Sequence, residues 1–288
     1  MNFTNKGNCL KRIPIFYRPE MVATTDSYSP SAAKPQLVVE DWLRHAIQPG
    51  DIHSFEPVAK AELYLAHSKD YVDGVLSCNL PNGFYNYDQS VADSLPYTVG
   101  SMVAATLHVA ERGGFACSPT SGFHHARYSE GGGFCTFNGL MVAALLARMQ
   151  GYRVGILDCD AHYGDGTDNI LAKNPGHGIK HHTFGAHFPT GTKAIGWTGW
   201  LQDAIDDLQD CDVVLYQAGA DPYERDPLGG QMGMTALALR DQMVFSDLPN
   251  VAWNLAGGYT RDSDGGICTV LGIHHHTLHA AQQTLKEN

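Results

Sequence analysis

Short runs of apolar residues recur along the chain and end in polar or glycine-rich turns. Strands buried on both faces have this pattern, because neither face meets water. We therefore predict strands at residues 114–117, 153–157, 212–216 and 251–255. Each of them runs directly into a cluster of polar or glycine residues.

Between these runs, apolar residues recur at helical spacing. The spacing predicts helices at residues 96–109, 138–149, 235–244 and 267–285. Strands that alternate with helices predict a mainly parallel central sheet covered on both faces, which is a three-layer α/β/α architecture. No repeat, low-complexity tract or linker interrupts the pattern, so we expect a single domain over residues 1–288.

Composition narrows the function classes. The chain has 43% hydrophobic and 17% charged residues, which is typical of a folded domain and not of a disordered one. Its net charge of -11 argues against nucleic-acid binding. No apolar run is long enough for a signal peptide or a membrane span. Seven scattered cysteines, including Cys9, form no CxxC pair, so we expect reduced thiols and a cytoplasmic location.

Candidate metal ligands follow two of the predicted strands. Asp160 and His162 come after residues 153–157, and because they are two residues apart they project to the same side. Asp221 follows residues 212–216 in a turn of small residues. Two carboxylates and one imidazole would leave an open position for water on zinc, and cobalt, iron or manganese could use the same ligands. Taken separately, the two segments could also be an acidic loop and an ordinary turn.

Candidate catalytic residues follow the other two strands. His124 and His125 lie in a glycine-bounded turn, and Asp158 and Asp165 could each hold one of their ring nitrogens. Tyr259 comes after two glycines, where its hydroxyl could donate to an oxyanion. The alternatives are solvated histidines and a tyrosine that caps the turn. Polar groups at the carboxyl ends of parallel strands are expected to converge on one site.

Six segments between about Leu63 and Tyr259 carry a family resemblance. In order they read AELYLAHSKDYVDGV, GFHHA, GGGFCTFNG, DCDAHYGDGT, GADPYERDPLGG and GGY. This series resembles the zinc-dependent histone deacetylase superfamily, which includes acetylpolyamine amidohydrolases. The first segment looks like an early helix of that family. The resemblance implies an arginase/deacetylase-type fold.

The resemblance also implies roles for the candidate residues. One zinc ion per chain would bind Asp160, His162 and Asp221. His124 and His125 would be the family's tandem histidines, paired with Asp158 and Asp165 respectively, and Tyr259 its catalytic tyrosine. Arginase-type second-metal ligands are replaced by Gly164 and Tyr223, which favours one metal and amide hydrolysis.

Substrate contacts are implied in the same way. Phe134 and Phe188 match the aromatic walls of the family's narrow channel, and Gly133 lies beside it. Asp226 belongs to a turn motif of structural type. Members also bind a structural potassium ion, but the segment 177–188 shows no obvious Ser or Thr at that place, so potassium is left undecided.

The implied activity is removal of an acetyl or related acyl group from lysine side chains of a protein or peptide by metal-activated water. The alternative substrate is an acetylpolyamine or another small N-acyl amine, and an acidic chain suits either cationic product. A third reading is a non-catalytic module that binds acyl-lysine. The sequence leaves the oligomeric state open.

Overall fold

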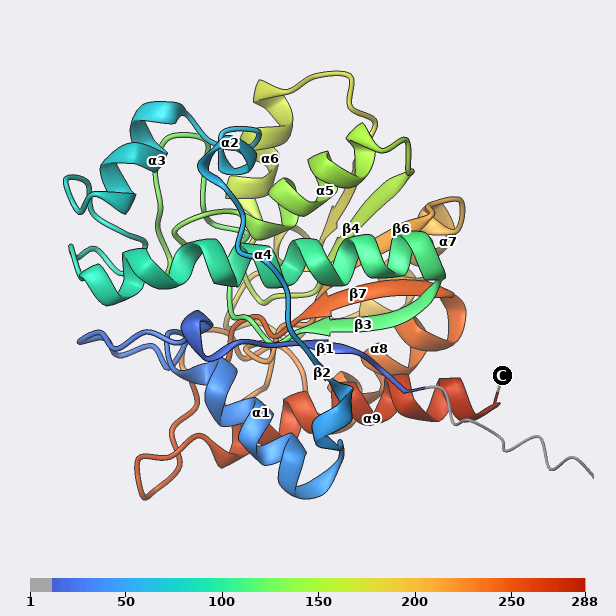
Figure 1. Cartoon of the computed structure of the whole chain (residues 1–288). Helices are drawn as coiled ribbons and strands as arrows, with labels where there is room; N and C mark the ends of the chain where they lie inside the picture. The colour runs from blue at the N-terminus through green and yellow to red at the C-terminus, as the bar shows by residue number, and fades with distance from the viewer. Residues whose placement is uncertain (1–11, 288) are drawn as a thin grey trace, which may run out of the picture.

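A seven-stranded parallel sheet forms the centre of the molecule (Figure 1). The computed structural model describes residues 12–287, so Cys9 lies outside the described residues. The strand order is β2-β1-β3-β7-β6-β4-β5. The strands are β1 (Ile15–Phe16), β2 (Ile52–His53), β3 (Gly114–Ser118), β4 (Val154–Asp158), β5 (Lys180–Thr183), β6 (Val213–Gln217) and β7 (Asn250–Asn254).

Helices cover both faces of this sheet, as the alternation of strands and helices predicts. Ile156 and Leu215 pack with the apolar residues of α4 and α5 on one face. Their neighbours Leu157 and Tyr216 point to the opposite face and pack with α1, α7, α8 and α9. The larger helices are α1 (Lys34–His45), α4 (Gln89–Arg112), α5 (Gly139–Met149), α6 (Asp165–Lys173), α7 (Trp197–Leu208), α8 (Met234–Asp247) and α9 (Cys268–Glu287).

The four predicted strands are confirmed to within one residue at each end, as β3, β4, β6 and β7. Three further strands of the sheet escaped prediction. β1 and β2 have two residues each, too few for a pattern to appear. β5 lies at the edge of the sheet and has the polar sequence KHHT, which lacks the apolar run by which the other four strands were predicted.

The predicted helices exist, but two differ from expectation. α4 begins at Gln89, so Pro96 lies inside it and not in its first turn. Val91 and Leu95 are buried before the proline, and this packing offsets the missing N–H donor. The expected early helix is two short helices, α2 (Lys60–Leu63) and α3 (Lys69–Leu76). Within the described part of the chain, none of the helices combines the length and apolar character that a bilayer crossing requires.

Strand register places the functional loops together. Asp158 of β4 pairs with Gln217 of β6, which pairs with Asn254 of β7, which pairs with Ser118 of β3. The last residues of four neighbouring strands therefore form one row. The loops that follow these strands all leave from the same edge of the sheet, where ligands bind in open α/β folds.

Candidate metal centre and active site

Asp160, His162 and Asp221 form a group that could hold a metal ion. Each offers one ligand atom, and these atoms lie within 4.8 Å of one another. His162 Nδ1 lies 3.0 Å from Asp160 Oδ1 and 3.0 Å from Asp221 Oδ2. Both carboxylates are buried, whereas the imidazole is partly exposed. The structure thus brings together the three residues that the sequence suggested as ligands.

The electrostatics of this group suit the binding of a cation. Burial and repulsion from Asp160 raise the pKa of Asp221 to about 7. Burial alone would lower the pKa of His162, but hydrogen bonds and the charges of the two carboxylates raise it to about 11. Asp221 Oδ2 is buried and receives no aligned hydrogen bond from the described residues. Oxygen and nitrogen ligands crowded around one point suit zinc, which would replace the proton between them.

Backbone hydrogen bonds and one glycine hold the ligands in place. Asp221 Oδ1 accepts from the N–H of Ala161 at 3.1 Å, which joins the two ligand-bearing turns. Gly257 adopts a φ of +52°, and a Cβ there would lie 2.4 Å from Asp221 Cγ. Only glycine therefore lets the loop after β7 pass so close to this ligand.

Two histidine–aspartate pairs lie beside the metal group. His124 Nδ1 is 2.7 Å from Asp158 Oδ2, and His125 Nδ1 is 2.7 Å from Asp165 Oδ1. The two imidazole centroids are 4.1 Å apart. Gly133 adopts a φ of +54°, and a Cβ there would lie 2.5 Å from His125 Cδ2. The pairing expected from the family resemblance is present.

The two imidazoles differ in charge. Burial would lower the pKa of His124, but the charges of Asp158 and Asp160 outweigh it and raise the pKa to about 9. Burial and the neighbouring charge of His124 lower the pKa of His125. In the metal-free protein, these shifts favour a proton on His124 at neutral pH and leave His125 able to accept one at Nε2.

Tyr259 lies on the loop after β7 and is 8% exposed. Its N–H donates to Asp226 Oδ2 at 2.6 Å, and Tyr28 donates from its hydroxyl to the Tyr259 carbonyl at 3.4 Å. Burial and the charge of Asp221 raise the pKa of the Tyr259 hydroxyl far above its usual value. The hydroxyl therefore keeps its proton and can only act as a donor or neutral acceptor at neutral pH. Asp226 serves the structural role expected of its turn.

The two expected channel aromatics lie on different loops. The Phe134 ring packs against Tyr259, with centroids 5.5 Å apart, and Phe188 packs against Phe184 at 4.7 Å. An open hollow of about 570 Å³ lies over the site. It is lined by His125, Arg127, Ala161, His162, Tyr163, Asp165, Gly185, Pro189 and Thr190. That Phe134, Phe188 and Gly133 contact substrate remains a prediction.

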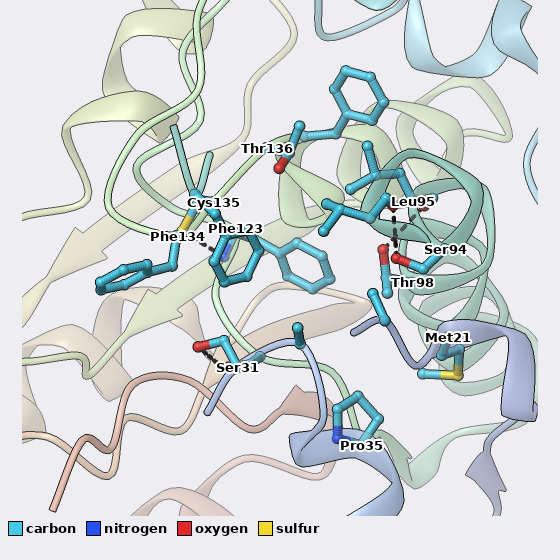
Figure 2. Close-up of a pocket in the computed structure, with 16 residues that line it drawn as sticks. Met21, Ser31, Pro35, Ser94, Leu95, Thr98, Phe123, Phe134, Cys135 and Thr136 are labelled. Atoms are coloured by element: carbon cyan, nitrogen blue, oxygen red, sulfur yellow. Dashed lines mark hydrogen bonds between the residues drawn. The ribbon is translucent and has the colours of Figure 1, made fainter. Parts of the chain in front are cut away.

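A second, smaller cavity lies behind the loop that carries Phe134. Figure 2 shows Phe123, Phe134 and Cys135 on one side of it and Ser94, Leu95 and Thr98 of α4 on the other. Its volume is about 50 Å³, enough for one or two water molecules. Cys135 Sγ accepts from the N–H of Phe123 at 3.2 Å. Burial raises the pKa of this thiol to about 12, so Cys135 stays a neutral thiol that packs in the protein interior.

Several contributors to the site were not identified from the sequence. Lys34 of α1 is fully buried and donates from Nζ to the carbonyl of Gly257, beneath the loop that carries Tyr259. Arg127 donates to Asp165 from Nε at 2.9 Å and from Nη2 at 2.6 Å. Lys34 is far in sequence from every motif, so no pattern in the sequence indicated a role for it. The position of Arg127, two residues after His125, could have given one.

The histidines of the 177–188 segment correct an expectation. We expected His181, His182 and His187 near the channel wall, in reach of substrate. His187 does lie beside Phe188, with ring centroids 6.4 Å apart. The His181 side chain, by contrast, is 3% exposed and pairs with Asp168 at 2.7 Å. His182 pairs with Asp207 at 2.9 Å at the edge of the sheet. The segment also contains a hydroxyl, that of Thr183, which accepts from the N–H of Gly164 at 3.0 Å.

Comparisons with known sequences agree with the motifs. The model of the histone deacetylase domain family matches residues 30–202. An uncharacterized protein of Picosynechococcus sp. is 29% identical, over 78% of this chain and 83% of that protein. Histone deacetylase 2 of Arabidopsis thaliana is 27% identical, over 71% of this chain and 62% of its own length. Acetylpolyamine amidohydrolase 2 of Pseudomonas aeruginosa is 28% identical, over 66% and 63% respectively.

A solved structure agrees in fold. The crystal structure of the HDA15 HD domain superposes with a TM-score of 0.76 at 18% sequence identity. The similarity covers 95% of this chain and 90% of that one. The parallel α/β architecture expected from the alternation of strands and helices is thus the one these proteins share.

Proposed function

Because this chain belongs to the histone deacetylase domain family, we propose that it is a zinc-dependent amidohydrolase that removes acetyl or a related acyl group from lysine side chains. One observation carries the proposal. The Asp160–His162–Asp221 group, both histidine–aspartate pairs and Tyr259 gather at one edge of the sheet. The substrate would be an acyl-lysine peptide or protein.

The proposed reaction joins water to the acyl carbon and releases a carboxylate and an amine. Zinc held by the three ligands would polarise the acyl carbonyl and lower the pKa of water to about 7. His125 accepts a proton from the attacking water at Nε2, because its Nδ1 is held by Asp165. The same proton can then pass to the leaving amine.

His124 and Tyr259 stabilise the developing negative charge. The protonated His124 places Nε2 3.6 Å from Asp160 Oδ1, so its charge faces the reaction centre. The protonated Tyr259 hydroxyl donates to the oxygen that becomes an oxyanion as water adds. Each of the two residues is buried and offers a donor, which favours the transition state over the bound substrate.

An acetylpolyamine is the second candidate substrate. The similarity to acetylpolyamine amidohydrolase 2 supports it as directly as the similarity to histone deacetylase 2 supports a lysine substrate, because the identities are 28% and 27%. Both substrates present an acylated amine on an aliphatic stem, and hydrolysis of either releases a primary amine. The same zinc, histidines and tyrosine would act on either one.

The deciding experiment is amine release from an acetyl-lysine peptide by the zinc-loaded protein. We expect activity that chelation abolishes, that His125→Ala lowers about 10²- to 10⁴-fold in kcat, and that Tyr259→Phe lowers about 10²- to 10³-fold with little change in KM. His182→Ala, at the edge of the sheet beside Asp207, is the matched control and should keep full activity.

Other outcomes redirect the proposal. Turnover of acetylpolyamines but not of the peptide would select the second candidate. Bound zinc without turnover of either substrate, or of longer acyl-lysines, would contradict the hydrolase proposal. A protein that binds acyl-lysine but takes up no zinc would be a non-catalytic module.

A further inference from the structure

A fully buried arginine lies beneath the two turns that carry the metal ligands. Arg240 of α8 has a side chain only 1% exposed and forms an ion pair with its neighbour Asp241, with Nη2 at 2.8 Å from Oδ1. Arginine is almost never fully buried unless it is paired. A buried ion pair is also costly to desolvate, and it often adds no net stability over apolar residues. Stability alone therefore does not account for the burial of Arg240.

The free corner of the guanidinium contacts both ligand-bearing turns. Arg240 Nη1 donates to the carbonyl of Gly219 at 2.7 Å and to the carbonyl of Cys159 at 3.2 Å. Cys159 directly precedes the ligand Asp160, and Gly219 lies two residues before the ligand Asp221. One nitrogen atom thus joins the turn after β4 to the turn after β6.

The two turns are in close contact at this point. A Cβ on Gly219 would lie 2.5 Å from the Cα of Asp160. The N–H of Cys159 donates to the carbonyl of Gln217 at 3.0 Å. A change in the position of either carbonyl would therefore shift the backbone that sets the spacing between Asp160 and Asp221.

The far side of Arg240 is fixed in turn. Asp241 accepts from the hydroxyl of Thr277 on α9 at 2.6 Å and from the hydroxyl of Tyr216 on β6. Arg240 Nε donates to Asp241 Oδ1 at 2.9 Å. The guanidinium is thus anchored to the helix layer by its carboxylate and reaches the ligand turns with its remaining donors. Its planar geometry suits this double contact, which the single nitrogen of lysine reproduces poorly.

We infer that Arg240 is a positioning residue that sets the spacing of the metal ligands and thereby the affinity of the site for zinc. The inference rests on the proposed zinc chemistry but not on the identity of the substrate. Groups that orient metal ligands without touching the metal commonly change affinity 10- to 100-fold when they are replaced.

The test measures zinc affinity on the metal-free full chain by competition with a chromophoric chelator, well below the unfolding temperature. Arg240→Lys keeps the charge, so a loss of affinity reports geometry. We expect zinc to bind about 10- to 100-fold more weakly. Arg148→Lys is the matched control, since that partly buried arginine bonds to the carbonyl of Tyr152 at 2.8 Å, at the end of α5. It should leave the affinity unchanged.

A purely structural role predicts a different result. In that case Arg240→Lys would lower the melting temperature of the metal-free protein and leave the zinc affinity of the folded protein unchanged, which would overturn the inference. If Arg240→Lys does not fold, Asp241→Asn decides, because it loosens the anchor and should weaken zinc at least several-fold. An unchanged zinc affinity in Asp241→Asn would also overturn the inference about Arg240. If the wild type binds zinc tightly but hydrolyses no substrate, the proposed function is contradicted, whereas the inference about Arg240 is unaffected.

Discussion

The two histidine–aspartate pairs contain the same residue types at the same distance but lie in different surroundings. In the His124–Asp158 pair the side chains are 2% and 0% exposed, whereas in the His125–Asp165 pair they are 25% and 26% exposed. The first imidazole is protonated at neutral pH and the second has a lowered pKa. The same pairing therefore favours a cation in one case and a base in the other, because Asp160 adds a second negative charge beside His124 while the charge of His124 opposes a proton on His125.

The partners of the two aspartates sharpen this contrast. Asp158 Oδ1 accepts from the N–H of Asp160 at 3.1 Å and from Gln217 Nε2 at 3.3 Å, both inside the protein. Asp165 accepts instead from Arg127, whose side chain is 46% exposed at the mouth of the site. Asp158 depends on groups that water cannot replace, whereas Asp165 is partly open to solvent.

The matched pair Asp158→Asn and Asp165→Asn should show the largest difference. Asp158→Asn breaks a fully buried ion pair and leaves the His124 charge without a partner, so we expect a loss of about 3–5 kcal/mol in the free energy of unfolding. Asp165→Asn should cost about 0–1 kcal/mol, because solvent screens that pair. Denaturant unfolding of the metal-free variants measures both. Equal losses would show that burial does not separate the pairs.

The sequence was sufficient to predict the composition of the site but not the surroundings of its members. Asp160, His162 and Asp221 could be identified because each follows an apolar strand, and parallel strands bring their carboxyl ends together. The difference between Asp158 and Asp165 could not be predicted, because exposure depends on loops packed from elsewhere in the chain. Lys34 and Arg240 reach the site from helices remote in sequence, where an isolated charged residue gives no pattern. The polar strand β5 escaped prediction for a similar reason, and with it the burial of His181.

A third buried imidazole tests whether the carboxylate, and not burial alone, gives His124 its charge. Among residues 12–287, His67 has only backbone hydrogen-bond partners, which are the carbonyl of Arg127 at 2.9 Å and the N–H of Asn138 at 2.8 Å. Burial lowers its pKa from 6.5 to about 4. The folded protein therefore holds His67 neutral, while the unfolded chain takes up a proton near pH 6.5.

The contribution of His67 to stability should accordingly be fully present above pH 6.5 and decline as the pH falls towards 4. The shift of the His67 pKa corresponds to about 3 kcal/mol of unfolding free energy lost across this window. Unfolding curves at several pH values, compared with those of His67→Gln, isolate this contribution, because the variant lacks the titrating group and should show a shallower decline. Identical pH profiles would mean that the pKa of His67 is the same in the folded and unfolded chain, so that burial does not hold this imidazole neutral.

Arg127→Gln should have the smallest effect and addresses the exposed pair directly. Although Arg127 donates two hydrogen bonds to Asp165, the pair is partly exposed, so water can take over from the guanidinium. We expect kcat/KM for the acetyl-lysine peptide to fall less than about 5-fold, which corresponds to about 1 kcal/mol or less. Arg127→Lys, which keeps the charge, should lie between this variant and the wild type. A loss of kcat/KM as large as that of His125→Ala would mean that Asp165 depends on Arg127 as strongly as Asp158 depends on its buried partners. The contrast between the two pairs would then come from their hydrogen-bond partners and not from their exposure to water.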